Sequence, residues 1–284
     1  MDNQSDAGGG MLGVCSWSLR PEDPVSLIEL LERVQLNAIQ LALMPAITEP
    51  RAWSDCFELL QARGIRIASG MLSMEAEDYT SLDSIRQTGG VRPDEHWQAN
   101  LDRALRVSDI AAENDVPLVT FHAGFIPHEA EDPERTKMLD RIAMFADIFQ
   151  ERGVRLALET GQETAETLVQ VLDQLSHPTL GVNFDPANML LYGMGDPIQA
   201  LRLLQPRLFQ VHIKDAVVSD VSGQWGTEVP AGEGDVDFPS FFQVLRDSSR
   251  PVDMMIEREA GKDRAEDIIT ARKLCEGLLK REQQ

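Results

Sequence analysis

The chain has 284 residues, a length that exceeds a minimal domain and fits a single α/β barrel. Its 47 Asp and Glu residues outnumber its 26 Lys and Arg residues, which gives a formal net charge of −21. A field of that sign repels phosphate backbones and anionic headgroups, so neither nucleic acid nor a membrane is an expected partner.

The first ten residues, MDNQSDAGGG, lack the basic and apolar regions of a signal peptide, and we expect a flexible tail over residues 1–10. The barrel domain is then expected over residues 11–284. The three cysteines, Cys15, Cys56 and Cys275, are odd in number and lack metal-type spacing. Because this pattern suits a reducing compartment better than a disulfide framework, the expected location is cytoplasmic.

Short apolar runs typical of buried strands alternate along the chain with stretches in which apolar residues recur at helical spacing. The runs cover residues 11–16, 36–43, 65–72, 117–122, 154–160, 179–184, 208–214 and 252–257. Asp23–Pro24 and Asp196–Pro197 predict helix starts with proline at the first helical position. The βα units together predict a single-domain (β/α)8 TIM barrel. A doubly wound open sheet is the alternative, but VCSWSLR follows the first strand where that fold carries a glycine-rich phosphate loop.

Two connections are long for this fold, at residues 73–95 and 215–237. The second contains Trp225 among several glycines, which are Gly223, Gly226, Gly232 and Gly234. Such a segment suits either a mobile flap with an aromatic tip over a substrate or a surface loop with turn glycines.

Four residues able to bind a metal lie near the ends of four successive strand runs, and they are Glu159, Asp185, His212 and Glu257. In a parallel barrel the carboxyl ends of the strands meet at one rim, where the active site is expected. Carboxylates and one imidazole, with no cysteine, suit one divalent metal ion such as Mn, Co, Mg or Zn. The alternative is a set of strand-end ion pairs. Lys214 and Arg258 are the only cations close to these strand ends, too few to neutralise three converging carboxylates.

Strand alternation indicates which neighbours share the interior face, because side chains two residues apart point to the same side. Asn183 should therefore point into the barrel, and Lys214 should point inward with His212. Lys214 is either a substrate contact beside the metal or the ion-pair partner of Asp215 or Glu257.

Five short motifs follow one another in the second half of the chain. They are LETG at 158–161, NFDPAN at 183–188, HIKD at 212–215, GEGDVDF at 232–238 and IERE at 256–259. Through this ordered set the chain resembles the xylose-isomerase-like barrel superfamily, and within it the sugar phosphate isomerase/epimerase group, over nearly all of residues 11–280. The resemblance implies that Glu159, Asp185, His212 and Glu257 bind one divalent ion. It also implies that the two glutamates act as acid and base on a sugar carbon.

The implied reaction moves a hydrogen between adjacent carbons of a keto sugar or related polyol. It requires removal of a weakly acidic C–H proton and stabilisation of the enediolate oxygen. A cation acts as Lewis acid and template, and a positioned carboxylate adds roughly 10²- to 10⁴-fold in rate. Glu159 and Glu257, approaching from opposite faces, would exchange the proton with inversion at one carbon. The expected function is that of a divalent-metal-dependent carbohydrate isomerase or epimerase.

Other side chains near the strand ends are candidate substrate contacts, namely Trp17, His122, Gln162, Asn188, Lys214 and Arg258. His122 has the place of a substrate-contacting histidine in the family, or it is a core histidine. Trp17 either stacks on a sugar face or plugs the top of the barrel. Asn188 and Gln162 either reach substrate hydroxyl groups or cap loops.

Departures from the family bear on the substrate. Repair endonucleases of the superfamily carry an extra histidine where this chain has Asn188, and the acidic field also disfavours DNA. Ketohexose epimerases carry an arginine near the position of Val218, so a free ketohexose is not the expected substrate. The strand ends carry no cluster of Lys and Arg that would hold a phosphate group.

Two further functions stay open from the sequence. A lyase or dehydratase of a keto-inositol or 3-keto-sugar removes the same acidic proton before a hydroxyl group leaves as water. A non-catalytic sugar-binding barrel would keep the metal ligands without turnover. In each case the partner is a small carbohydrate, and a homo-oligomer is compatible with the sequence.

Overall fold

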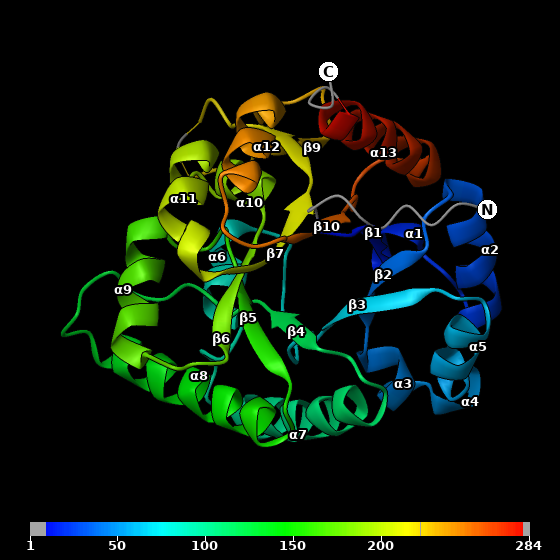
Figure 1. Cartoon of the computed structure of the whole chain (residues 1–284). Helices are drawn as coiled ribbons and strands as arrows, with labels where there is room; N and C mark the ends of the chain where they lie inside the picture. The colour runs from blue at the N-terminus through cyan, green and yellow to red at the C-terminus, as the bar shows by residue number, and fades with distance from the viewer. Residues whose placement is uncertain (1–9, 222, 281–284) are drawn as a thin grey trace.

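The strands of the computed structural model close into a barrel that a ring of helices surrounds (Figure 1). The model describes residues 10–221 and 223–280. The barrel order is β1-β10-β7-β6-β5-β4-β3-β2. The strands are β1 (Leu12–Cys15), β2 (Ala38–Ala42), β3 (Arg66–Met71), β4 (Leu118–Phe121), β5 (Arg155–Glu159), β6 (Leu180–Phe184), β7 (Leu208–Ile213) and β10 (Asp253–Ile256). Each lies inside a predicted run, and closure confirms the (β/α)8 barrel over the open sheet.

The helices lie outside the strands and fill the connections between them (Figure 1). They are α1 (Ser16–Leu19), α2 (Pro24–Val34), α3 (Met44–Thr48), α4 (Pro50–Trp53), α5 (Cys56–Ala62), α6 (Leu82–Thr88), α7 (Trp97–Glu113), α8 (Pro133–Glu151), α9 (Ala165–Leu175), α10 (Pro186–Leu191), α11 (Pro197–Leu204), the 3₁₀ helix η1 (Gln205–Arg207), α12 (Phe238–Arg246) and α13 (Arg264–Lys280). Within the described residues, no helix combines the length and apolar character needed to cross a membrane. The tail expected at residues 1–10 lies outside the described residues apart from Gly10.

Both predicted Asp–Pro helix starts are present. The Asp23 side chain accepts a hydrogen bond from Ser26 N at 2.7 Å at the start of α2. The Asp196 side chain accepts one from Gln199 N at 2.8 Å at the start of α11. These caps satisfy amide groups that a helix leaves unpaired, and they fix where each helix begins.

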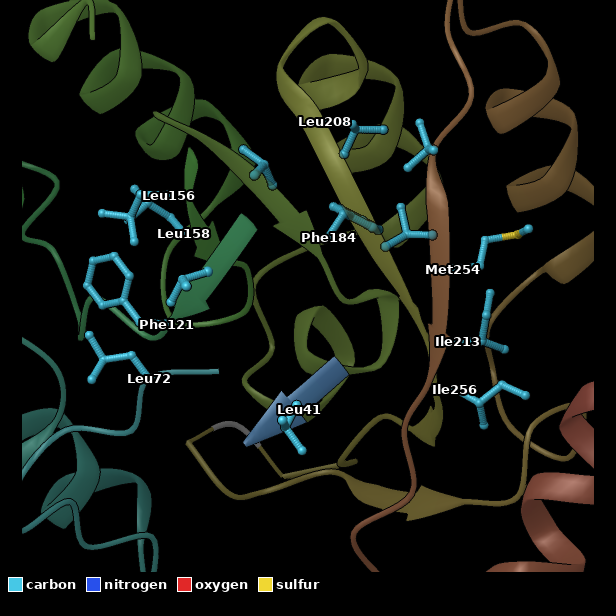
Figure 2. Packing of buried hydrophobic residues seen from close by; sticks show 14 of the residues in the cluster. Leu41, Leu72, Phe121, Leu156, Leu158, Phe184, Leu208, Ile213, Met254 and Ile256 are labelled. Carbon is cyan, nitrogen blue, oxygen red and sulfur yellow. The ribbon is translucent and has the colours of Figure 1, made fainter. Parts of the chain in front are cut away.

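Strand alternation separates the apolar packing into an outer layer and an inner cluster. The outer side chains pack between barrel and helices, and Figure 2 labels ten of them: Leu41, Leu72, Phe121, Leu156, Leu158, Phe184, Leu208, Ile213, Met254 and Ile256. A much smaller buried cluster is formed by Cys15, Ala68 and Met255. The predicted ligands alternate with outer-layer residues, so core packing turns them inward.

The interior below the rim is polar. Five uncharged side chains with no exposed surface lie there, namely Gln40, Ser69, Thr120, Asn183 and Gln210. Gln40 Nε2 donates to Thr120 Oγ1 at 2.7 Å, and Ser69 Oγ donates to Gln210 Oε1 at 2.6 Å. Gln210 Nε2 donates to Asn183 Oδ1 at 3.2 Å, as expected if Asn183 faces inward. Buried polar groups are costly unless paired, so this network holds its members in fixed orientations.

The connection 215–237 forms a two-stranded antiparallel sheet of β8 (Asp215–Val217) and β9 (Thr227–Val229). Asp215 Oδ2 accepts hydrogen bonds from Gly232 N at 2.8 Å and Gly234 N at 2.9 Å, which fixes the base of the segment. Trp225 packs edge-on against Tyr192, with ring centroids 4.7 Å apart. The segment is thus a hairpin fixed at its base and at its aromatic end, where the sequence predicted only a flap or a loop.

Candidate active site

Four strand ends bring the predicted metal ligands together at the carboxyl-end rim of the barrel. Glu159 ends β5 and Asp185 directly follows β6. His212 lies in β7, and Glu257 directly follows β10. One ligand atom of each residue lies within 4.8 Å of the others, and no member is more than 5% exposed. The predicted convergence of these side chains is therefore present.

His212 lies at the centre of the cluster. Its Nδ1 atom is 3.5 Å from Glu159 Oε1 and 3.5 Å from Asp185 Oδ2. The same atom is 3.3 Å from Glu257 Oε2. His212 Nδ1 and Asp185 Oδ2 are buried and have no hydrogen-bond partner among the described residues. Because unpaired buried polar atoms are costly, and because three carboxylates and one imidazole suit a borderline-hard cation, the donor set fits one divalent ion.

The two carboxylate oxygens of Asp185 have different surroundings: Oδ1 caps a helix, and Oδ2 faces His212. Its Oδ1 atom accepts hydrogen bonds from Ala187 N at 2.8 Å and Asn188 N at 3.1 Å at the start of α10. Thr160 Oγ1 accepts a hydrogen bond from the Asp185 backbone N–H at 2.8 Å. The two hydrogen bonds to Oδ1 fix the rotamer that leaves Oδ2 directed at the other three side chains, and the contact with Thr160 holds the Asp185 backbone.

The polar interior orients the imidazole. Gln40 Oε1 lies 2.7 Å from His212 Nε2, and the Gln40 amide nitrogen already donates to Thr120. A neutral His212 that donates its Nε2 proton to Gln40 presents the Nδ1 lone pair to the carboxylates. Coordination of a metal through Nδ1 requires that tautomer.

Side chains from the short helices α1 and α10 hold the two glutamates. Trp17 Nε1 donates to Glu257 Oε1 at 2.7 Å. Asn188 Nδ2 donates to Glu159 Oε1 at 3.1 Å. These contacts position the two glutamates, a role that the sequence did not suggest for Trp17 or Asn188, and both residues also line the cavity described below.

Lys214 is almost completely buried against carboxylates. Its Nζ atom lies 2.8 Å from Glu257 Oε2 and 2.6 Å from Glu259 Oε2. Asp185 Oδ2 lies 3.8 Å away. Burial disfavours the ammonium, but Glu257 and then Glu259 hold the pKa of Lys214 well above its usual range. Of the two ion-pair partners considered from the sequence, Glu257 is present, whereas Asp215 binds backbone amides instead.

Burial and neighbouring charges shift the pKa values of the cluster residues in different directions. Burial raises the pKa of Asp185, and Lys214 offsets only part of that effect. Burial also opposes ionisation of Glu257, yet Lys214 and then His212 hold its pKa well below the usual range. Burial disfavours the imidazolium, but surrounding negative groups raise the pKa of His212 well above its usual range. A metal ligand must be a neutral imidazole, so metal uptake would displace a proton from His212.

A cavity of about 410 Å³ adjoins the cluster and falls within the size range of small-molecule sites. Its walls include four aromatic rings, those of Trp17, Tyr79, Tyr192 and Trp225. Its polar lining consists of Ser73, Glu77, His122, Asn188, Lys214, Glu257 and Glu259. His122 Nε2 lies 3.5 Å from Glu159 Oε1, while its buried Nδ1 has no partner among the described residues. His122 is therefore a cavity histidine with a free ring nitrogen.

Two other candidate substrate contacts have different placements. The Arg258 guanidinium donates to Glu228 Oε1 and to Asp267 Oδ2, both at 2.8 Å, and does not line the cavity. Gln162 is buried, its Nε2 atom has no hydrogen-bond partner among the described residues, and it lines a second cavity. Neither residue lines the cavity beside the cluster, and Arg258 holds the hairpin through Glu228.

Sequence reasoning missed several cavity residues, namely Glu77, Tyr79, Tyr192 and Glu259. Alternation from Glu257 would have pointed to Glu259, since it is two residues further along. Glu77 and Tyr79 lie in the connection 73–95, whose irregular backbone gives no period from which to infer orientation.

Comparison with known proteins places the chain near enzymes of sugar and related metabolites. A family model described as xylose isomerase-like TIM barrel matches residues 30–276. The structure is similar to that of a xylose isomerase domain protein from Planctomyces limnophilus, with a TM-score of 0.87 and 27% sequence identity. That similarity covers 97% of this chain and 99% of the other.

Two curated proteins are similar in sequence. One is 3-oxo-isoapionate decarboxylase of Pectobacterium atrosepticum, 26% identical over 160 residues, covering 55% of this chain and 57% of the relative. The other is 3-dehydroshikimate dehydratase of Bacillus anthracis, 27% identical over 131 residues, covering 40% of this chain and 46% of the relative. The chain thus spans about half the length of these curated relatives.

Proposed function

The chain belongs to the xylose isomerase-like TIM barrel family, and from that premise we propose that it is a divalent-metal-dependent isomerase or epimerase of a keto sugar or related polyol. The observation that carries the proposal is the cluster of three carboxylates around His212 Nδ1, two of whose polar atoms are buried and unpaired. A partly open cavity with aromatic walls adjoins this cluster and suits a sugar.

Glu159 and Glu257 are the proposed acid and base. β5 and β10 are separated in the barrel by β6 and β7, so the two glutamates flank the cluster from opposite sides. A divalent ion held by the four ligands would supply Lewis-acid stabilisation and fix the substrate oxygens. A glutamate on each face of the substrate carbon can remove a proton from one side and return it from the other.

The remaining cavity groups have supporting roles in this proposal. Lys214 offers an ammonium to a substrate oxygen beside the cluster, and His122 offers its free Nδ1 to a hydroxyl group. The indole of Trp17 and the rings of Tyr192 and Trp225 exclude water and present flat apolar faces to a sugar ring.

A test of the proposal follows hydrogen exchange in D₂O. Keto sugars and inosose are incubated with wild-type protein and each candidate metal, and the products are analysed by mass spectrometry. We expect deuterium to enter an isomeric product. Glu159→Gln and Glu257→Gln keep an oxygen donor but cannot accept the carbon proton, so turnover should fall by more than about 10²-fold. Glu233→Gln, in an exposed turn, is the matched control and should behave as wild type.

Each other outcome has a defined meaning. Full turnover in either active-site variant would make that glutamate a ligand only. A metal-loaded wild-type protein that incorporates no deuterium into any candidate would favour the non-catalytic sugar-binding barrel.

A second candidate is a lyase or dehydratase, and the similarity to a curated dehydratase and a curated decarboxylase favours it. The proton abstraction is the same, but a hydroxyl group then leaves, and Lys214 or His122 would donate the proton to it. The same experiment separates the two, because the lyase product is lighter than its substrate by one water.

A further inference from the structure

Lys214 is the one Lys or Arg side chain among the described residues that line the cavity. Its ammonium is enclosed between Glu257 and Glu259 at 2.8 and 2.6 Å. Asn188 Oδ1 lies 3.5 Å away. The Lys214 side chain is only 2% exposed, whereas the Glu259 side chain is 53% exposed. A ligand oxygen that reaches the ammonium therefore meets a cation whose charge two carboxylates already match.

Charge at this end of the cavity is negative even when a metal is counted. Lys214 and a divalent ion together bring three positive charges against four carboxylates, those of Glu159, Asp185, Glu257 and Glu259. A further carboxyl, Glu77, also lines the cavity, and the Arg258 guanidinium is held by Glu228 and Asp267. A ligand carboxylate or phosphate would thus lack a free cationic partner and would face like charge, which is strongly unfavourable at desolvated sites.

We propose, resting on the function proposed above, that Glu259 is a specificity-determining residue that holds Lys214 and restricts the site to uncharged sugars and polyols. Once a metal engages Glu257, Glu259 remains as the dedicated partner of the ammonium. Without the Glu259 charge, Lys214 is free to pair with an anionic group on a ligand. Glu259 acts through Lys214 and through its own charge at the entrance, and it needs no contact with the reacting carbon.

The test compares two unreactive ligands that differ in one charged group, methyl glucopyranoside and methyl glucopyranosiduronate. Dissociation constants are measured by ligand-observed NMR on Mg²⁺-loaded protein, so the readout does not depend on turnover. We expect the wild-type protein to favour the neutral glycoside by about tenfold or more. In Glu259→Gln that preference should shrink by about tenfold, because the uronate gains a charge-assisted contact with Lys214.

Two variants distinguish the pairing of Glu259 with Lys214 from an effect of the total charge of the cavity. Glu77→Gln removes the same charge from the same cavity without touching Lys214, and should change the preference by less than about threefold. Glu259→Gln combined with Lys214→Met should lose the gain for the uronate. If that gain persists in the double variant, the metal takes the carboxylate and the role of Glu259 is overturned.

The remaining outcomes also decide the matter. Equal effects of Glu77→Gln and Glu259→Gln would overturn the specific role of Glu259 in favour of overall cavity charge. Equal binding of both ligands by the wild-type protein would overturn the filter but leave the proposed reaction standing. A metal-loaded wild-type protein that binds neither ligand would overturn the sugar site itself, together with the filter.

Discussion

Glu163 is a carboxyl group buried in the loop after β5, four residues beyond the proposed ligand Glu159. Burial alone raises the pKa of Glu163 to about 8. A carboxyl whose folded-state pKa lies above its unfolded value stabilises the fold fully below the unfolded pKa, and that contribution is lost as the pH rises through the folded pKa. The protein therefore loses stability between roughly pH 4.5 and pH 8 through this group.

Glu163→Gln should remove this pH dependence. At pH 8 we expect the variant to be more stable than the wild type by about 3–5 kcal/mol, and at pH 4 the two should be nearly equal. Urea unfolding at several pH values measures the difference. Glu166→Gln, on the exposed side of α9, is the control. A stability gain that stays the same from pH 4 to pH 8 would contradict an ionisation cost at Glu163.

Strand alternation predicts the direction in which a side chain points only for residues in a strand or directly next to one. Glu159, His212, Lys214 and Asn183 lie in or next to strands, and alternation gave their facing correctly. Gln162 lies past Gly161, whose φ of +134° turns the chain away from the cavity. An added Cβ at Gly161 would lie 2.4 Å from Asn188 Cβ, so this turn depends on a packing contact that no local pattern reveals.

At the scale of elements, the hairpin of β8 and β9 depends on one buried carboxylate. Asp215 accepts hydrogen bonds from the backbone N–H groups of Gly232, Gly234 and Val236, and also from that of Ala216. An added Cβ at Gly234 would lie 2.3 Å from Asp215 Oδ1, so glycine is needed there for the close approach. The hairpin therefore forms one wall of the cavity through long-range contacts more than through strand propensity.

Asp215→Ala should loosen the hairpin of β8 and β9 that forms this wall of the cavity. Loss of the acceptor leaves several amides without a partner, and we expect about 2–4 kcal/mol of destabilisation with faster proteolytic cleavage between β8 and β9. Chemical unfolding and limited proteolysis measure both effects. Asp235→Ala removes a carboxylate that accepts a backbone hydrogen bond from Val218 N, and it should cost less than about 1 kcal/mol. Equal losses in the two variants would mean that Asp215 does not organise the hairpin.

The eight barrel strands were predictable because each is a continuous apolar run bounded by helical periodicity. β8 and β9 were not, since three residues are too few to establish alternation. The number of βα units also predicts that the barrel closes, but it does not predict that the interior of the barrel is polar. Gln40 and Gln210 are buried polar residues in strands with mostly apolar side chains. Only their hydrogen bonds with Thr120 and Ser69 on other strands explain why polar side chains are tolerated there.

At the scale of the whole molecule, a net charge of −21 and a buried carboxylate cluster predict that a bound divalent ion stabilises the fold. A divalent ion that binds only the folded state stabilises it by about 2.7 kcal/mol at one hundred times its Kd. We expect Mn²⁺ or Mg²⁺ to raise the Tm by several degrees over chelator-treated protein. Asp185→Ala should abolish that rise, and differential scanning calorimetry measures it. An equal rise in the variant would show that the ion binds elsewhere on the acidic surface.

The hydrogen bond from Trp17 Nε1 to Glu257 Oε1 at 2.7 Å has an optical consequence. Indole emission depends on the charge facing its N–H group, and a cation that engages Glu257 draws electron density away from that oxygen. Trp97, by contrast, is stacked on Phe145 with ring centroids 5.4 Å apart, remote in sequence from every proposed ligand. Trp17 is thus an intrinsic fluorophore whose emission wavelength and intensity should follow occupancy of the ligand cluster, observed together with the emission of Trp53, Trp97 and Trp225. Metal titrations then need neither a label nor a substrate.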